Sequence, residues 1–208
     1  MFGFQSKTTM RPKTLLEMAG AAATPTHLAD SVLIVIDAQR EYVDGKLPLR
    51  GVKPALAEIG TLLARARKAG APVIHIQHRG RPGGAFGPDT GGFAIADAAA
   101  PTGTEAVIEK SLPNSFAGTT LGAALEALSR KQLIVTGFMT HMCIEATTRA
   151  ALDHGFKTTV VAAATATRDL PDPLTGETVP AAEVQRNALT ALSDRFATIA
   201  ANAAAILD

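Results

Sequence analysis

Residues 132 to 155, QLIVTGFMTHMCIEATTRAALDHG, constrain the fold more than any other stretch, because they predict a buried strand that leads directly into a helix. The run from Leu133 to Val135 is apolar and rich in β-branched residues, which is typical of a buried strand. Gly137 then ends the run, and the Thr140 hydroxyl is placed to cap the next helix. From residue 142 to residue 154 the pattern is helical, so we expect a strand, a sharp turn and a helix in immediate succession.

Other apolar runs repeat this alternation along the chain. Residues 32 to 36 read VLIVI, a continuous run that is typical of a strand buried on both faces, as in parallel sheets covered by helices. Further strands are expected at residues 72–77, 106–109, 157–163 and 196–199, and helices at residues 52–69, about 120–129 and 181–192. The alternation predicts an α/β fold, with a doubly wound and mainly parallel sheet of five or six strands and helices on both faces.

The length of 208 residues indicates one domain with a sizeable core. Before the first strand there is only a short Ala-rich helical pattern around residues 14–22, followed by Pro25. We therefore expect residues 1–30 to form an N-terminal arm that lies on the surface or embraces a partner subunit. Residues 31–208 contain no internal repeat or interdomain linker and are expected to form a single domain.

Charge and cysteine content argue against several classes of partner. A net charge of +1 gives no electrostatic reason to expect nucleic acid or an anionic membrane as a partner. No uninterrupted apolar run approaches the length needed to cross a bilayer. A single cysteine forms no intramolecular disulfide, which favours a reducing compartment. We expect a cytoplasmic protein whose partner is a small-molecule substrate.

Three polar residues follow predicted strands, at the edge where such a fold places its chemistry: Asp37, Lys110 and Cys143. Cys143 is the only cysteine, and its place in the first turn of a helix favours the thiolate through unpaired N–H groups and the helix dipole. A carboxylate, a cation and a thiol at one edge supply the base, the charge stabiliser and the nucleophile of acyl transfer. The simpler interpretation is a buried, inert cysteine, a capping aspartate and a solvated lysine. Glycines for a dinucleotide pyrophosphate do not follow the first strand, so we expect no cofactor.

The segments around these three residues resemble the three signature blocks of the isochorismatase-like cysteine hydrolase superfamily, in the order that the superfamily has them. The blocks are VLIVIDAQREY, EKSLPNSFAGTTL and LIVTGFMTHMCIEATTRAALDHG. The resemblance implies a catalytic triad of Asp37, Lys110 and Cys143. It also implies a cis peptide bond between Phe138 and Met139, and an oxyanion hole formed by the backbone N–H groups of Met139 and Cys143.

The activity that this resemblance implies is that of a cysteine hydrolase, which cleaves the C–N bond of a small amide, ureide or carbamoyl substrate through a thioester. In this mechanism Asp37 takes the proton of Cys143, while Lys110 and the helix dipole lower the pKa of the thiol. Two alternatives stay open: a vinyl-ether hydrolase of the isochorismatase type, and a non-catalytic ligand-binding or redox-sensing module. Isochorismatases characteristically lack the nucleophilic cysteine, and a sensor thiol has no need of a positioned carboxylate.

Residues that follow or adjoin the signature blocks are predicted to line the substrate pocket. Gln39 and His78 would supply polar groups that orient the substrate, and Tyr42 and Phe116 would supply apolar walls.

A long Gly- and Pro-rich loop, residues 81–103, follows the second strand, and its Phe86 and Phe93 are candidates to close over a pocket. Nicotinamidases of the superfamily carry a metal site with a D-x-H pattern soon after this strand. Here residues 77–80 read QHRG, and the next histidine is His141. The sequence therefore disfavours a metal and nicotinamidase activity. Members of the superfamily are commonly oligomers, so we expect a homo-oligomer, a dimer or a tetramer.

Overall fold

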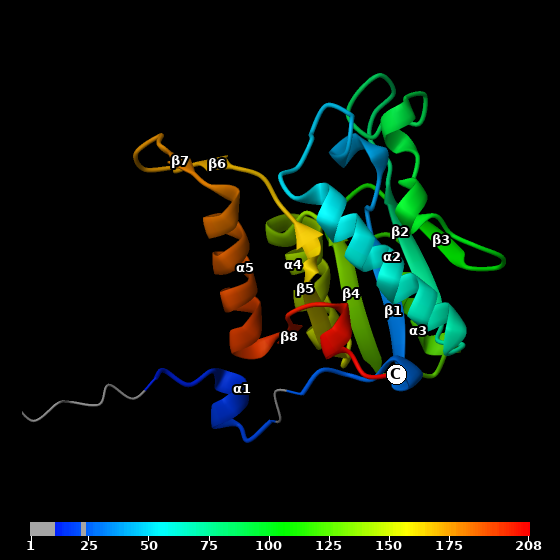
Figure 1. The fold of residues 1–208 in the computed structure, drawn as a ribbon, viewed down its shortest axis with the longest axis vertical. Helices are drawn as coiled ribbons and strands as arrows, with labels where there is room; N and C mark the ends of the chain where they lie inside the picture. The colour runs from blue at the N-terminus through cyan, green and yellow to red at the C-terminus, as the bar shows by residue number, and fades with distance from the viewer. Residues whose placement is uncertain (1–10, 22–23) are drawn as a thin grey trace, which may run out of the picture.

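The computed structural model describes residues 11–21 and 24–208, and a parallel sheet lies at its centre (Figure 1). Within these residues the sheet has six strands in the order β3-β2-β1-β4-β5-β8, and every neighbouring pair is parallel. The strands are β1 Ser31–Ile36, β2 Val73–His78, β3 Ala106–Lys110, β4 Gln132–Phe138, β5 Lys157–Ala166 and β8 Thr198–Ala200. The prediction of a doubly wound α/β fold with a mainly parallel sheet is confirmed.

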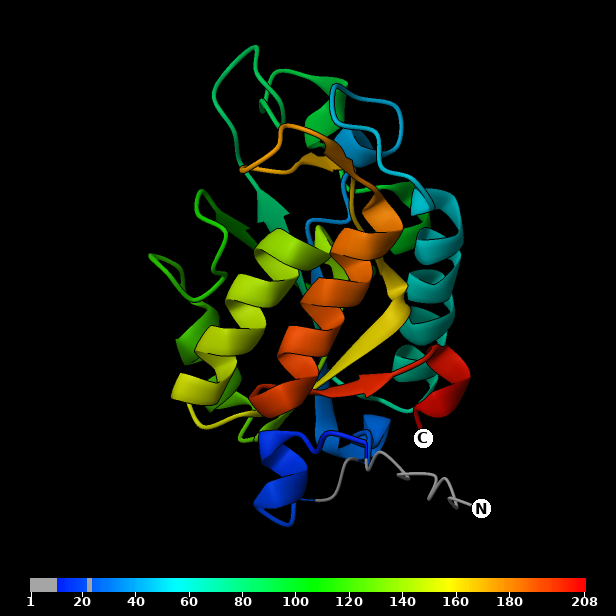
Figure 2. The same cartoon turned by 90° about the vertical axis from the view of Figure 1, so that its left-hand side faces the viewer.

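Helices cover both faces of the sheet, with α2 on one face and α4 and α5 side by side on the other (Figure 2). The helices are α2 Val52–Lys68, α3 Leu121–Ala127, α4 Glu145–Asp153 and α5 Ala181–Arg195. Leu33 and Val35 of β1 belong to the core cluster that includes α2, whereas Val32 and Ile34 belong to the cluster that includes α3 and α5. Because successive side chains of a strand point to opposite faces, β1 is buried on both, which explains its unbroken apolar run.

The strand order reverses between β1 and β4, and at such a point an open α/β sheet forms a crevice outside the carboxyl ends of its strands. β4 runs close to β1 through Gly137, whose φ is +113° and where a Cβ atom would lie 1.9 Å from the Ile36 carbonyl oxygen. Only glycine fits at this position. The prediction that Gly137 ends the strand is wrong, because β4 continues to Phe138.

The segment after β5 differs from the expected loop. β5 extends to Ala166 because its last residues still pair with β4. Beyond it, β6, Leu170–Pro171, pairs with β7, Thr178–Val179, in an antiparallel hairpin that projects from the body of the protein (Figure 1). A second difference concerns the end of the helix that was expected at about residues 120–129. α3 ends at Ala127, and Leu128 is 37% exposed.

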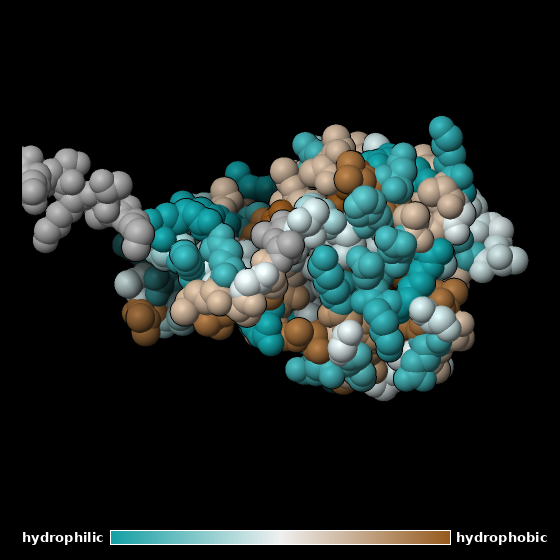
Figure 3. Space-filling view, turned by 90° about the horizontal axis from the view of Figure 1, so that it is seen from below, coloured by the Kyte–Doolittle hydropathy of each residue, from teal (hydrophilic) through white to brown (hydrophobic). Residues whose placement is uncertain are grey.

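The N-terminal segment contacts the rest of the chain near the amino ends of the strands. α1, Leu15–Met18, begins with a capping box, and the Leu15 N–H donates to the Asp194 carboxylate of α5 over 2.9 Å. The predicted helical pattern extends to residue 22, which lies outside the described residues, and α1 is shorter. Seen from below, hydrophobic residues form separate patches between hydrophilic ones (Figure 3). None of the helices in the described part of the chain is long and apolar enough to cross a membrane.

Candidate active site

Asp37, Lys110 and Cys143 lie in direct contact at the carboxyl edge of the sheet. The Lys110 Nζ atom is 2.6 Å from Asp37 Oδ2 and 3.3 Å from Cys143 Sγ. The side chains of Asp37 and Lys110 are wholly buried, and Cys143 is 5% exposed. The structure thus brings together the carboxylate, the cation and the thiol that the sequence analysis placed at one edge.

The strand order explains why the cation is a lysine. Asp37 follows β1, and Lys110 is the last residue of β3, which lies two strands away. Neighbouring strands are about 4.8 Å apart, so their backbones are separated by roughly 10 Å. The four-carbon stem of Lys110 spans the end of β2 and delivers its ammonium group to Asp37.

Asp37 has a left-handed backbone conformation and a buried carboxylate that is only partly hydrogen-bonded. Its φ is +50°, a left-handed conformation that few residues other than glycine adopt and that aspartate tolerates better than most. Oδ2 accepts from Lys110, but Oδ1 is buried and has no hydrogen-bond partner among the described residues. Burial raises the pKa of Asp37, although the Lys110 ammonium acts in the opposite direction. A carboxylate with a free oxygen and a raised pKa is suited to accept a proton.

Cys143 lies in a π-helical turn, Thr140–Ile144, that joins β4 to α4. The predicted cap is wrong: the Thr140 hydroxyl donates to the Ala166 carbonyl oxygen over 3.1 Å, and α4 begins only at Glu145. Burial, and then the charge of Asp37, raise the pKa of Cys143 to about 12, with Lys110 opposing them. Burial thus acts against the lowered thiol pKa expected from the sequence, and it outweighs the opposing effect of Lys110.

The peptide bond between Phe138 and Met139 is cis, just before this turn. The Met139 carbonyl oxygen accepts from the N–H groups of Met142 and Ile144, over 3.0 and 3.2 Å. The backbone N–H group of Met139 donates to no other residue that the structure describes. This backbone N–H group therefore has no partner among the described residues and remains available as a hydrogen-bond donor.

Two predicted pocket residues, His78 and Tyr42, belong to the surroundings of this site. His78 Nδ1 is 3.4 Å from the Lys110 Nζ atom. Because an ammonium group only donates, this contact assigns the proton of a neutral His78 to Nε2. Burial, and then Lys110, lower the pKa of His78, which favours the neutral ring. The Tyr42 ring meets the Phe138 ring edge-on, with centroids 5.7 Å apart. Burial raises the pKa of Tyr42 and keeps its phenol neutral.

Gln39 differs from its predicted role. Its side chain is fully buried, and its Nε2 donates to the carbonyl oxygens of His78 and Phe93, over 2.9 and 2.8 Å. Its Oε1 accepts from the His78 N–H over 2.7 Å. Gln39 therefore joins β2 to the long loop that follows it, and its amide is not available to orient a substrate.

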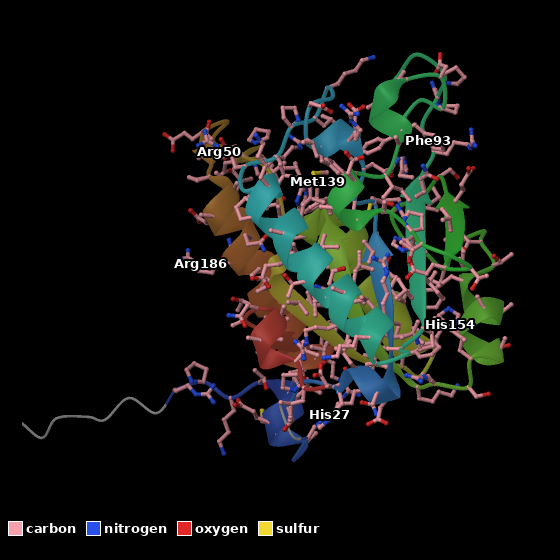
Figure 4. The ribbon with its side chains drawn as sticks, turned by 45° about the vertical axis from the view of Figure 1, so that its right-hand side comes forward. His27, Arg50, Phe93, Met139, His154 and Arg186 are labelled. Carbon is pink, nitrogen blue, oxygen red and sulfur yellow. The ribbon has the colours of Figure 1, made fainter. Side chains whose placement is uncertain are left out.

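Phe116 also differs from its predicted role as a pocket wall. Its ring stacks on His154, with centroids 4.4 Å apart, and on Phe156. His154 follows α4, eleven positions after Cys143, which corresponds to about 16 Å along a helix. Figure 4 shows Met139 and His154 at opposite ends of the sheet. Phe116 is therefore remote from the thiol.

The long loop holds one aromatic residue at the site. Phe86 is 6% exposed, and its ring lies 5.0 Å from the Tyr42 ring and 5.1 Å from the His78 ring. Phe93 is only half-buried, and its carbonyl oxygen accepts from Gln39 and Gln77. How this loop is held could not be predicted from the sequence, because nothing in the loop itself identifies its partners in the β1–α2 connection.

A cavity of about 550 Å³ lies at the same edge of the sheet, between β5, α5 and the start of α2. Arg50, Asp169 and Gln185 line it, together with Thr167, whose hydroxyl contacts His141 Nδ1. His141 belongs to the turn that carries Cys143, so the cavity adjoins that turn. In the part of the chain that the structure describes, no three His, Cys, Asp or Glu side chains are grouped to hold a metal ion.

The family model of the isochorismatase domain matches residues 31–204. The chain therefore belongs to the isochorismatase family, as the resemblance of its three sequence blocks predicted.

Similar proteins extend this assignment. The crystal structure of an isochorismatase from Pseudomonas putida KT2440 is 38% identical, with a TM-score of 0.90, and the match covers 95% of this chain and 100% of that chain. The secreted isochorismatase effector Isc1 of Verticillium dahliae is 35% identical over 88% of this chain and 93% of its own length. A streptothricin hydrolase of Streptomyces noursei is 39% identical over 78% of this chain and 59% of its own length. More distant relatives include a maleamate amidohydrolase and a ureidoacrylate amidohydrolase. The family and these relatives identify the chain as a hydrolase.

Proposed function

We propose that the protein is a cysteine hydrolase that cleaves the C–N bond of a small amide, ureide or carbamoyl compound. The observation that carries this proposal is the position of the Lys110 ammonium between Asp37 Oδ2 and Cys143 Sγ, while Asp37 Oδ1 remains unpartnered among the described residues. A nucleophile, a base with a free acceptor and a fixed cation are the parts that acyl transfer requires.

Attack and deprotonation occur together, because a thiol with a pKa of about 12 is protonated at neutral pH. Asp37 takes the proton of Cys143 as Sγ adds to the substrate carbonyl carbon. Lys110 balances the negative charge as it moves from the carboxylate to the substrate oxygen. The N–H groups of Met139 and Cys143 donate to that oxygen, a role in which one donor is typically worth about 3 kcal/mol.

Collapse of the adduct breaks the C–N bond, and Asp37 returns its proton to the leaving nitrogen. The acyl group remains on Cys143 as a thioester. Asp37 then removes a proton from water, whose oxygen adds to the thioester carbonyl, and the C–S bond breaks. The sulfur recovers the proton from Asp37, so the free enzyme is regenerated and the same carboxylate serves as base and acid in turn.

The names of the relatives suggest where to search for the substrate, since they include hydrolases of maleamate, nicotinamide, ureidoacrylate and streptothricin. The test is a panel of these compounds and other small amides and ureides, with released ammonia or amine as the readout. Isochorismate belongs in the panel, because its cleavage would replace our proposal by vinyl-ether hydrolysis.

For any compound that is cleaved, we expect Cys143→Ala to lose about 10⁴-fold or more in kcat. Acid quenching of the wild-type reaction should yield a chain whose mass is increased by the acyl group, located on the peptide that carries Cys143. Turnover by Cys143→Ala at the wild-type rate would refute the proposal.

A further inference from the structure

Glu41 carries a carboxylate that the proposed reaction does not use. It is 2% exposed, and no ion pair joins it to a cation among the residues of known placement. Two backbone N–H groups satisfy it instead: Lys46 donates to Oε1 over 2.7 Å and Phe86 donates to Oε2 over 3.3 Å. Lys46 belongs to the connection between β1 and α2, and Phe86 to the long loop after β2. One buried carboxylate therefore ties two loops together beside the site.

Two glycines make room for this carboxylate. A Cβ atom at Gly92 would lie 2.1 Å from Glu41 Oε2, and 3.4 Å from the nearest Glu41 backbone atom. A Cβ atom at Gly45 would lie 2.6 Å from the Cα atom of Glu41. Gly92 thus makes room for the Glu41 side chain, whereas Gly45 makes room first for the Glu41 backbone and also for its Cδ atom, which would lie 2.9 Å away. Both loops approach Glu41 more closely than any residue with a side chain would allow.

Phe86 depends on this contact for its conformation. Its φ is +56°, which is unfavourable for a bulky residue and persists only where surrounding contacts hold it. Its N–H is bound by Glu41, and its carbonyl oxygen accepts from the Gly80 N–H over 2.9 Å. Held in this way, the ring packs edge-on against Tyr42 and His78.

The contacts continue from Phe86 to the reacting groups. The His78 ring, fixed on one side by Phe86, places its Nδ1 3.4 Å from the Lys110 Nζ atom, which in turn holds Asp37. The chain of contacts from Glu41 to Lys110 therefore has two intermediates, both aromatic rings that border the site.

From these contacts we propose that Glu41 is a positioning residue: it fixes the loop that carries Phe86, and thereby the aromatic wall formed by Tyr42, His78 and Phe86 against which the substrate binds. The inference rests on the proposed function for the identity of the reaction, but not for the arrangement of the loop. Glu41 itself touches no reacting atom, so its loss should act mainly on substrate binding.

The first test compares Glu41→Ala with Glu41→Gln on a substrate that the wild type cleaves. We expect Glu41→Ala to raise KM about tenfold and to lower kcat less than about threefold, because the wall becomes mobile while the thiol and its base remain. Glu41→Gln keeps one acceptor but sets its NH2 group against the other loop N–H, so its KM should lie between those of Glu41→Ala and the wild type. An unchanged KM in Glu41→Ala would overturn the proposal.

The second test uses the glycines as a matched pair. Gly92→Ala should raise KM like Glu41→Ala, and the double variant Glu41→Ala/Gly92→Ala should be no worse than Glu41→Ala alone, because the clashing side chain is gone. Gly45→Ala is the control: its two shortest contacts, 2.6 and 2.7 Å, are with the Glu41 backbone, so removing the Glu41 side chain should leave those clashes in place. Independent, additive effects of Gly92→Ala and Glu41→Ala would contradict the proposal.

A readout that needs no substrate separates this inference from the proposed function. The rate at which iodoacetamide labels Cys143 at pH 9 should rise at least about fivefold in Glu41→Ala, because opening of the loop exposes a thiol that is almost buried. If Cys143→Ala retains turnover while this labelling effect is present, the proposed reaction fails and the loop arrangement stands. If labelling does not change and Cys143→Ala is inactive, the inference about Glu41 fails alone.

Discussion

Two clusters of charged residues occupy opposite ends of the β2–β3 pair, and the carboxylates of the two clusters are hydrogen-bonded in opposite ways. At the amino end, Glu105 lies just before β3 and contacts Arg67 of α2 and His75 of β2. At the carboxyl end, Lys110 closes β3 and contacts Asp37 and Cys143. Each cluster has one carboxylate and one cation, but their hydrogen bonding differs.

Glu105 is fully satisfied. Arg67 donates to both of its oxygens over 2.8 Å, the Thr102 N–H donates over 2.9 Å, and His75 Nε2 lies 3.0 Å away. The Arg67 hydrogen bonds, with help from Thr102 and His75, lower the pKa of Glu105 to about 2. This carboxylate is held in its charged form and stabilises the folded state.

Asp37 is not satisfied to the same degree. Its Oδ2 atom accepts from the Lys110 ammonium, but its Oδ1 atom has no hydrogen-bond partner among the residues described. Burial raises the pKa of Asp37. Similar residues thus stabilise the fold where every acceptor is filled, whereas an open acceptor and a raised pKa suit the proton transfer that we propose for Asp37.

The largest effect on stability is expected from Lys110→Met. This variant leaves the Asp37 carboxylate buried without a cation, and we expect it to lower the free energy of unfolding by about 3 to 5 kcal/mol. Urea denaturation measures this. Arg67→Met is the matched change at the other end, and it should lower the free energy of unfolding by only about 1 to 2 kcal/mol, because Thr102 and His75 still contact Glu105.

The double variant Asp37→Asn/Lys110→Met removes both charges and should recover most of the stability without activity. If Lys110→Met is no more destabilising than Arg67→Met, the distinction between the two clusters is lost.

A smaller, pH-dependent effect is expected from Glu105→Gln. The folded-state pKa of Glu105 is lowered from 4.5 to about 2, so its contribution is fully present above pH 4.5 and is lost as the pH falls toward 2. At pH 7 the variant should be less stable than the wild type by about 1 to 2 kcal/mol, because solvent screens part of the interaction of this partly exposed carboxylate. Unfolding curves between pH 7 and pH 3 should converge as the pH falls, and a difference that is independent of pH would contradict the assignment.

The smallest effect is expected in the labelling of Cys143 by iodoacetamide. Labelling should be slow at pH 7 and accelerate as the pH rises, because the reactive thiolate forms only as the pH approaches about 12. Asp37→Asn removes the charge that adds to the effect of burial, so labelling at pH 9 should become about tenfold faster while turnover falls. Slower labelling in Asp37→Asn would mean that the carboxylate activates the free thiol.

The sequence was sufficient to predict the fold and the meeting of the three residues, because both follow from parallel strands. Continuous apolar runs such as VLIVI indicate buried parallel strands, and the residues that follow such strands lie at the carboxyl edge of the sheet. The prediction failed where tertiary contacts decide. Thr140 bonds to β5 instead of capping a helix, and Phe116 packs on His154, a partner that no local pattern indicates.

The thiol pKa and the role of Glu41 were missed for a related reason. Local sequence gives the helix end and the neighbouring charges, but it does not give the depth of burial that dominates the pKa of Cys143. Glu41 lies in a polar stretch, REYVDG, that is typical of a surface turn. The close approach of Gly92 and of the Phe86 N–H group, both from a distant loop, encloses its carboxylate.

The contacts of Lys110 with Asp37 and Cys143 also have a consequence for the folding of the protein. They join residues 73 and 33 positions apart in the chain, from strands on both sides of the point where the order reverses. Contacts of such separation form late in folding, since long segments must be brought together before they stabilise anything. A nascent or partly folded chain therefore holds Cys143 apart from Asp37, and the proposed reaction requires strands from both sides of that point to be in place. Recovery of activity during refolding would thus report the last step of assembly rather than the first.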